Sequence, residues 1–179
     1  MVEEIRTLDI GITGFLRELK LSYWISEELG GDPATVLEKV KCDGCLTQVF
    51  PAPLIVGHQQ LQLAAALTFE AYLKGTAVSK KPEIQFLLFF TGTRQISQAI
   101  EKSRELGGPP YILVRACIHG NTCSPPPSQW EVISEEEVGA WTDLRTVSKM
   151  YGVNLTGKER AEALKTVLTA IAYSKLLMR

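Results

Sequence analysis

Residues 51–107 read PAPLIVGHQQLQLAAALTFEAYLKGTAVSKKPEIQFLLFFTGTRQISQAIEKSRELG, and this stretch carries most of what the sequence predicts about the fold. Its first part predicts an Ala-rich helix over 58–74, because alanine and leucine favour helices and Gly75 is placed to end one. The run 83–90 is nearly all apolar, which predicts a central strand covered on both faces. We therefore expect a helix followed by a buried strand of a sheet.

The turn Thr91-Gly92-Thr93 predicts the start of a second helix over 94–105, with Ile96 and Ile100 on one face. A helix N-terminus carries unpaired N–H groups and positive potential, so this turn can hold a phosphate, with Arg94 adding a guanidinium. Glycine turns also join strands to helices without any ligand. A phosphate site and a plain connection therefore both remain interpretations of this turn.

The rest of the chain supplies further strands and an irregular segment. Alternating or β-rich patterns predict strands over 9–15, 46–50 and 111–118, and an edge strand over 130–133. Residues 120–128 contain three consecutive prolines and predict an irregular loop. Strands and helices do not alternate regularly, so we predict a single α+β domain over residues 1–179, with one mostly antiparallel or mixed sheet packed with helices.

Three local signals predict where further helices begin. Asp32 before Pro33 places an N-cap residue ahead of proline at the first helical position, and Val36, Leu37 and Val40 are expected to be buried. The segments 134–137 and 156–159 match capping boxes. The second of these is expected to open a last helix that extends to Leu177.

Composition limits the classes of function. The chain has 179 residues, 45% hydrophobic content, 22% charged residues and a net charge of −1, which are ordinary values for a globular protein. This charge excludes a globally basic RNA-binding protein, so any RNA contact must be a local patch. The first residues lack the features of a signal peptide, and no apolar run is long enough to span a membrane. We therefore expect a cytoplasmic protein.

Candidates for catalysis are scarce. The two histidines are His58 and His119, and His58 is expected to cap the helix that it begins. The acidic residues 135–137 are expected to lie at a helix N-terminus, where their negative charge interacts favourably with the helix dipole. No motif of a serine hydrolase, zinc protease or nucleotide-binding loop occurs. We therefore predict a protein that is not an enzyme, with no catalytic residue and no cofactor.

The four cysteines leave three interpretations open. Cys42 and Cys45 have the C-x2-C spacing of a zinc knuckle, whereas Cys117 and Cys123 form a looser second pair. A redox motif of this spacing usually lies at the start of a helix after a strand, whereas here it follows a predicted helix. Structural or disulfide-bonded cysteines are preferred over zinc and over redox catalysis, so no metal is assigned. Disulfides inside a cell would be typical of a hyperthermophile.

The central stretch is similar to the small kinase-binding subunit of the KEOPS (EKC) complex, the family known in animals as PRPK-binding protein. The segments that carry the resemblance are PAPLIVGHQQLQLAAALTFEA and SKKPEIQFLLFFTGTRQISQAI. In that family a Pro-flanked stretch leads an Ala-rich helix, and a Glu-led apolar strand ends in a small-residue turn before Arg-Gln-Ile. DIGITGF and YGVNLTGKERAEALKTVLTAIA resemble its first strand and final helix. The cysteines and the Pro-rich loop depart from the family pattern.

The resemblance implies a non-catalytic protein that binds and supports the kinase-like ATPase subunit of KEOPS. That complex installs threonylcarbamoyl on the adenosine beside the anticodon of tRNAs that read ANN codons. The subunit is expected to hold the tRNA 3′ CCA end. Single-stranded ends are held by stacking and backbone charge, so we expect RNA contacts from Lys80, Lys81, Arg94 and Arg104.

The last helix is the predicted docking site for the kinase-like partner. Its apolar positions exceed one narrow stripe, and surplus exposed apolar surface is typical of interfaces. The residues assigned to this contact are Leu164, Val167, Leu168 and Ile171. The alternative is a helix buried on two sides by its own domain. A second hypothesis for the whole chain is an independent small-molecule enzyme or metal/redox protein with a phosphate site at the Gly92 turn.

Overall fold

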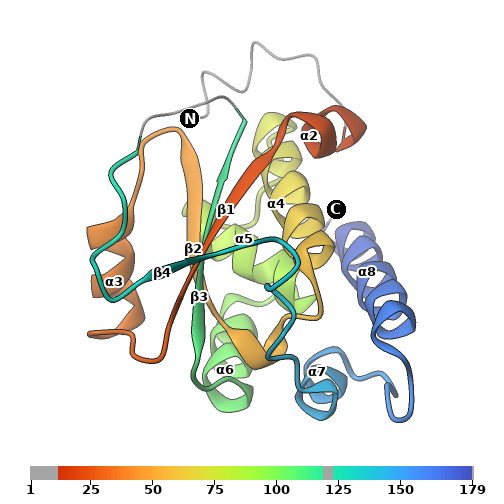
Figure 1. Ribbon diagram of the computed structural model, residues 1–179. Coiled ribbons are helices and arrows are strands. Elements are labelled where there is room, and N and C mark those ends of the chain that lie inside the picture. Colours follow the sequence, from red (N-terminus) through yellow and green to blue (C-terminus); the bar gives the residue numbers. More distant parts are fainter. Residues whose placement is uncertain (1–11, 119–122, 179) are drawn as a thin grey trace.

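A four-stranded antiparallel sheet forms the centre of the protein, and seven helices pack with it in the part of the chain that the structure describes (Figure 1). The structure is a computed structural model that describes residues 12–118 and 123–178. The strands lie in the order β2-β3-β1-β4. Their bounds are Lys20–Ser26 for β1, Cys45–Pro51 for β2, Tyr111–Cys117 for β3 and Glu131–Ile133 for β4. The predicted α+β fold is confirmed.

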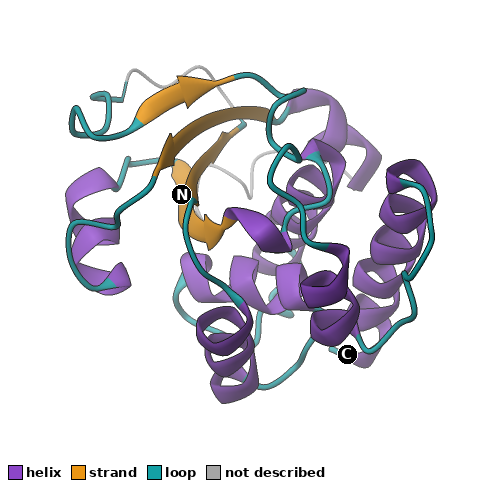
Figure 2. Cartoon of the chain, turned by 60° about the horizontal axis from the view of Figure 1, so that its bottom comes forward, coloured by secondary structure: helices purple, strands orange, loops and turns teal. Residues whose placement is uncertain are grey.

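The helices divide unequally between the two faces of the sheet. Their bounds are Ile12–Glu18 for α2, Pro33–Val40 for α3, His58–Leu73 for α4, Pro82–Thr91 for α5, Ile96–Leu106 for α6, Leu144–Tyr151 for α7 and Arg160–Leu177 for α8. In Figure 2 most helices lie together on one side of the sheet, and α3 lies apart from them. Among these helices, none is long and apolar enough to cross a membrane.

The main core lies between the sheet and the larger group of helices. The Phe50 ring of β2 contacts the rings of Phe86 and Phe90 on α5, at centroid distances of 5.0 and 4.2 Å. All three rings are fully buried. A smaller apolar cluster on the opposite face joins Val36 and Val40 of α3 to the sheet. Truncating such a ring typically costs about 3–5 kcal/mol, so this contact fixes α5 on the sheet.

Several predictions with strong local signals are confirmed. The Ala-rich helix is α4, and the strand predicted to end at Pro51 is β2. The Asp32 carboxylate accepts hydrogen bonds from the backbone N–H groups of Ala34 and Thr35, and Pro33 begins α3. The strands predicted over 111–118 and 130–133 are β3 and the edge strand β4, and the last helix ends at Leu177 as expected. Residues 123–128 have no regular secondary structure, as predicted for the Pro-rich loop, whose first residues lie outside the described part.

The strand predicted over 83–90 is wrong, because this segment is the helix α5. Pro82 occupies the first helical position, and Gly92 ends the helix in the left-handed conformation, with φ of 65°. The amides of Gly92 and Thr93 donate to the carbonyls of Phe89 and Leu88. The segment is apolar all round because α5 packs against the sheet, α4, α6 and α8. A short apolar run carries no periodicity that separates a buried helix from a buried strand.

The N-terminal strand predicted over 9–15 is also wrong where the structure describes it. Residues from Ile12 onward belong to α2, and residues 9–11 lie outside the described part. The buried Phe15 and Leu19 are four residues apart, and the Phe15 ring stacks on Phe69 of α4 at 6.1 Å. This four-residue spacing, which is typical of a helix, becomes visible only when Leu19, which lies beyond the predicted strand, is included. The strand β1, which comes next, was not predicted, and neither was α7.

The two predicted capping boxes do not begin helices where expected. Glu137 accepts a hydrogen bond from the Ser134 amide at 2.8 Å, but turns follow instead of a helix. The Thr142 hydroxyl donates to the Ile55 carbonyl at 2.6 Å and ties this segment to the chain before α4. In the second box, α8 starts only at Arg160, with no side-chain hydrogen bond capping its N-terminus. The capping-box pattern therefore did not determine where a helix begins in either segment.

Glu70 ties α4 to the end of α8 and gives a testable effect on stability. Its carboxylate is only 4% exposed and pairs with Lys74 at 2.6 Å and with Lys175 at 2.5 Å. Burial opposes the charged form, but the hydrogen bonds from Lys175 and Lys74 outweigh it and hold the pKa of Glu70 below its ordinary value of 4.5.

We expect Glu70→Gln to lower the free energy of unfolding by about 1–2 kcal/mol at neutral pH, since the lysines keep part of their hydration. Because the folded pKa is depressed, this stabilisation is present above pH 4.5 and is lost as the pH falls through the lowered pKa. Urea denaturation of both proteins at several pH values measures the difference. The exposed Glu162→Gln is the matched control and should change stability by under about 0.5 kcal/mol. A wild-type advantage that persists unchanged at low pH would contradict the assignment.

Candidate functional site

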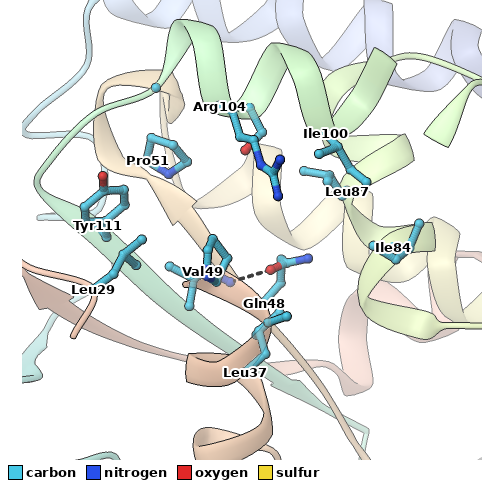
Figure 3. Close-up of a pocket in the computed structure, with 14 residues that line it drawn as sticks. Leu29, Leu37, Gln48, Val49, Pro51, Ile84, Leu87, Ile100, Arg104 and Tyr111 are labelled. Carbon is cyan, nitrogen blue, oxygen red and sulfur yellow. Dashed lines mark hydrogen bonds between the residues drawn. The ribbon is translucent and has the colours of Figure 1, made fainter. Parts of the chain in front are cut away.

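A pocket of about 310 Å³ opens beside the edge strand β2, between α3 on one face of the sheet and α5 and α6 on the other. Figure 3 shows its walls, with Val49 and Pro51 of β2 facing Leu87 of α5 and Ile100 of α6. The remaining lining residues come from segments before, within and after these elements: Leu29, Pro33, Ala34, Leu37, Gln48, Ile84, Ser103, Arg104, Gly107 and Tyr111. Its size falls at the lower end of small-ligand pockets.

Gln48 and Gly107 determine how closely the elements around this pocket approach one another. The Gln48 side chain accepts from the Val49 amide at 2.8 Å and donates to the Glu83 carbonyl at 2.8 Å, which joins the edge of β2 to the first turn of α5. Gly107 follows α6, and a Cβ there would lie 2.1 Å from Cγ of Pro51. Only glycine therefore allows α6 to end so close to β2. The pocket depends on this approach.

The lining is mostly apolar and carries a single formal charge. That charge is the guanidinium of Arg104, which Figure 3 shows extending from α6 toward the space between β2 and α5. No lining residue is acidic, and no described carboxylate lies within ion-pair distance of Arg104. The Gln48 amide is already used in structural hydrogen bonds. The pocket therefore offers apolar walls with a positive group at its mouth.

The four residues predicted to contact RNA do not all lie together. Lys80 and Lys81 are exposed and directly precede α5, and Lys81 is one helical turn before the pocket residue Ile84. Arg94 is exposed in the turn between α5 and α6 and is not part of the pocket lining. Arg94 precedes Arg104 by ten residues, which corresponds to about 15 Å along a helix axis. Arg104 thus lines the pocket, the lysine pair precedes the helix that forms one of its walls, and Arg94 lies outside the lining.

The Gly92 turn does not have the geometry expected of a phosphate site. It joins two helices, and Gly92 caps the C-terminal, carbonyl end of α5. The amides of Gly92 and Thr93 both donate to carbonyls of α5 and so are not available to an anion. The negative end of the α5 dipole also faces this turn. An anion at this turn would therefore have to contact the N-terminus of α6, which begins at Ile96 without a side-chain cap, and the phosphate-site hypothesis stays a prediction.

His58 joins three segments of the fold. Its Nδ1 lies 2.8 Å from the Tyr23 hydroxyl of β1, and its Nε2 lies 3.7 Å from the Glu135 carboxylate. Burial, together with the Glu135 charge, raises the pKa of Tyr23 and keeps the phenol neutral. No nucleophile completes this group among the described residues, and His119 lies outside them. The contacts act as a link between β1, α4 and the turns after β4, and sequence analysis did not predict them.

The residues predicted to bind a partner separate into two classes. Val167 and Ile171 are fully buried in the main core and face the protein's own domain. Leu164 and Leu168 are half-buried on α8. Tyr173 and Leu176, at 60% and 56% exposed, present the most open apolar surface of this helix. The alternative of burial by the protein's own domain thus holds for Val167 and Ile171, whereas docking of a partner on the exposed face stays a prediction.

The cysteines meet at one end of the sheet. Disulfides join Cys42 to Cys123 and Cys45 to Cys117, in agreement with the disulfide interpretation. Cys45 and Cys117 are paired residues in the β2–β3 register. Gly44 between the first two cysteines has φ of 76°, a conformation that favours glycine in this tight turn.

No family model matches the chain, and no curated protein has a significantly similar sequence. The assignment of a function therefore rests on the pocket, the charges around it and the free face of α8.

Proposed function

We propose that this protein is a non-catalytic adaptor subunit of a KEOPS-type complex, which binds a kinase-like ATPase subunit and the 3′ CCA end of tRNA. The observation that carries the proposal is the apolar pocket beside β2 with Arg104 at its mouth. The resemblance of residues 51–100 to the kinase-binding family supplies the identity of the complex. The cytoplasm, as the compartment of tRNA modification, belongs to the same proposal.

The pocket suits an unpaired nucleotide. Apolar walls and the Tyr111 ring can cover a base, and base stacking on protein is worth about 1–3 kcal/mol per base. Arg104 can form a charge-assisted contact with the adjoining phosphate. Lys80 and Lys81 are exposed directly before α5, which forms one wall of the pocket, and can contact the adjoining RNA backbone. A protein with net charge −1 then binds RNA through one local site.

The partner-binding part of the proposal rests on α8. Its half-buried Leu164 and Leu168 and exposed Leu176 recur at helical spacing and form an apolar face beside the core face. A helix face of this kind fits an apolar surface on another subunit.

Titration of the full chain with tRNA that either carries or lacks its CCA end tests the function. We expect the intact tRNA to bind at least tenfold more tightly, because the loss of stacked bases and their phosphate contacts removes more than about 1.4 kcal/mol. Fluorescence anisotropy at matched salt measures both affinities. Equal affinities would contradict recognition of the 3′ end and leave the pocket without this role.

A further inference from the structure

The sulfurs of three cysteines form one cluster, and the fourth cysteine, Cys117, joins it through its disulfide to Cys45. The sulfurs of Cys42, Cys45 and Cys123 all lie within 4.8 Å of one another, and Cys117 is bonded to Cys45. Cys45 and Cys123 belong to different disulfides, yet their sulfurs are only 3.8 Å apart. The fold thus brings the two C-x-x-C residues, the end of β3 and the loop that contains Cys123 close together.

This spacing matches a tetrahedral metal site. A Zn–S bond is about 2.3 Å, so the edge of a regular ZnS4 tetrahedron is about 3.8 Å. The contact between Cys45 and Cys123 already has this length. Separating the sulfurs of each bridge from bonding distance to the same spacing takes a movement of about 1.7 Å. The backbone therefore holds three of the sulfurs close to the spacing of ligands around one ion, and the fourth, on Cys117, is bonded to one of these three.

Arg115 provides an independent observation. Its side chain is 5% exposed, and it lies two residues before Cys117 on the same face of β3. One guanidinium nitrogen donates to the carbonyl of Ser124, next to Cys123, and another donates to that of Val40. Its Nε has no hydrogen-bond partner, and no described carboxylate pairs with it.

A buried cation needs a counter-charge, because removing an unpaired charge from water is costly. Neutral disulfide sulfurs supply none. Four thiolates around a divalent ion carry a net charge of −2, next to the two carbonyls that hold Arg115. The stacking of Arg115 on the Trp24 ring at 5.1 Å offers only partial compensation.

We propose that Cys42, Cys45, Cys117 and Cys123, once reduced, bind one Zn²⁺ as a tetrathiolate site with Arg115 as its counter-charge. A phosphine reductant converts each disulfide and one water into two thiols and a phosphine oxide. Zn²⁺ then replaces four thiol protons, which leave to solvent, and no electron is transferred in this second step. Thiolate ligands in tetrahedral geometry select zinc over harder divalent ions. The site is independent of the proposed RNA pocket.

The test is a metal titration of the full chain in two redox states. We expect the protein reduced with phosphine under anaerobic conditions to bind one Zn²⁺ per chain, with release of close to four protons near pH 7. Co²⁺ in place of Zn²⁺ should give the visible absorption of a tetrahedral thiolate complex. The oxidised protein should bind neither ion. If the reduced chain unfolds, one equivalent of Zn²⁺ should restore its circular dichroism. Reduced protein that neither binds nor is restored by Zn²⁺ would overturn the proposal.

Two variants separate ligation from adventitious binding. Cys123→Ser should lose the tetrathiolate cobalt spectrum and stoichiometric zinc binding. Arg115→Gln should keep the spectrum but weaken zinc affinity by about tenfold to a hundredfold, as is typical for residues that support metal ligands. Arg17→Gln, an exposed arginine on α2, is the matched control and should bind as the wild type does. Zinc affinity that is unchanged in folded Cys123→Ser would refute the site.

Discussion

Replacing Ile171 by glutamate is expected to unfold the protein. The Ile171 side chain is fully buried in the main core, so the variant loses the burial of an isoleucine, worth about 1.5–3 kcal/mol. It also places a carboxylate inside an apolar cluster, which adds several kcal/mol more. The sum approaches the total stability of about 5–15 kcal/mol that is typical of a domain. Circular dichroism and urea denaturation measure the effect.

The matched substitution on the same helix is Leu176→Glu. Leu176 is 56% exposed, so this variant should stay folded and change stability by under about 1 kcal/mol. It should weaken binding of the kinase-like ATPase subunit, since a charge then lies on the proposed docking face. A folded Ile171→Glu would show that α8 is not part of the core. Unchanged partner affinity of Leu176→Glu, measured by calorimetry, would remove this face from the interface.

The parts of the fold that could be predicted from the sequence are those determined by interactions between residues a few positions apart in the chain. Asp32 and Pro33 determine the start of α3, because capping needs only the local backbone. The alanine- and leucine-rich composition of α4 and the glycine that follows it likewise act without distant contacts. The helix α5 could not be predicted in this way, because its apolar character comes from the sheet and the helices that surround it. A segment that is buried on every side loses the periodicity by which helices and strands are distinguished.

The pocket could not be predicted from the sequence, for a related reason. Its walls come from four separated segments, and their meeting depends on β2 being an edge strand and on the close approach of Gly107 to Pro51. Arg104 was named because the resemblance predicted RNA contacts from basic residues, whereas Tyr111 and Leu29 carried no signal. Arg94 does precede the N-terminus of α6, as predicted, but the segment before the turn is the helix α5 and Arg94 lies outside the pocket lining.

The exchange of Arg104 for glutamate is the sharpest test of the RNA pocket. Arg104 extends toward the pocket from α6 and is exposed, so Arg104→Glu should leave the fold intact. Loss of a charge-assisted phosphate contact costs about 1–3 kcal/mol, so we expect tRNA affinity to fall about tenfold to a hundredfold. The wild-type affinity should decrease only gently with salt, because few phosphates are contacted.

Arg94→Glu is the matched control, since it changes the net charge of the protein by the same amount. Arg94 lies at the other end of α6, about 15 Å along the helix and outside the pocket lining, so a change in overall charge alone would affect both variants equally. We expect the Arg94 variant to bind tRNA within about threefold of the wild type at physiological salt, since screening weakens charges beyond roughly 8 Å. Removal of the CCA end should abolish the difference between the two variants. Equal losses in both variants would indicate non-specific attraction, and the RNA end would then have to bind elsewhere on the protein.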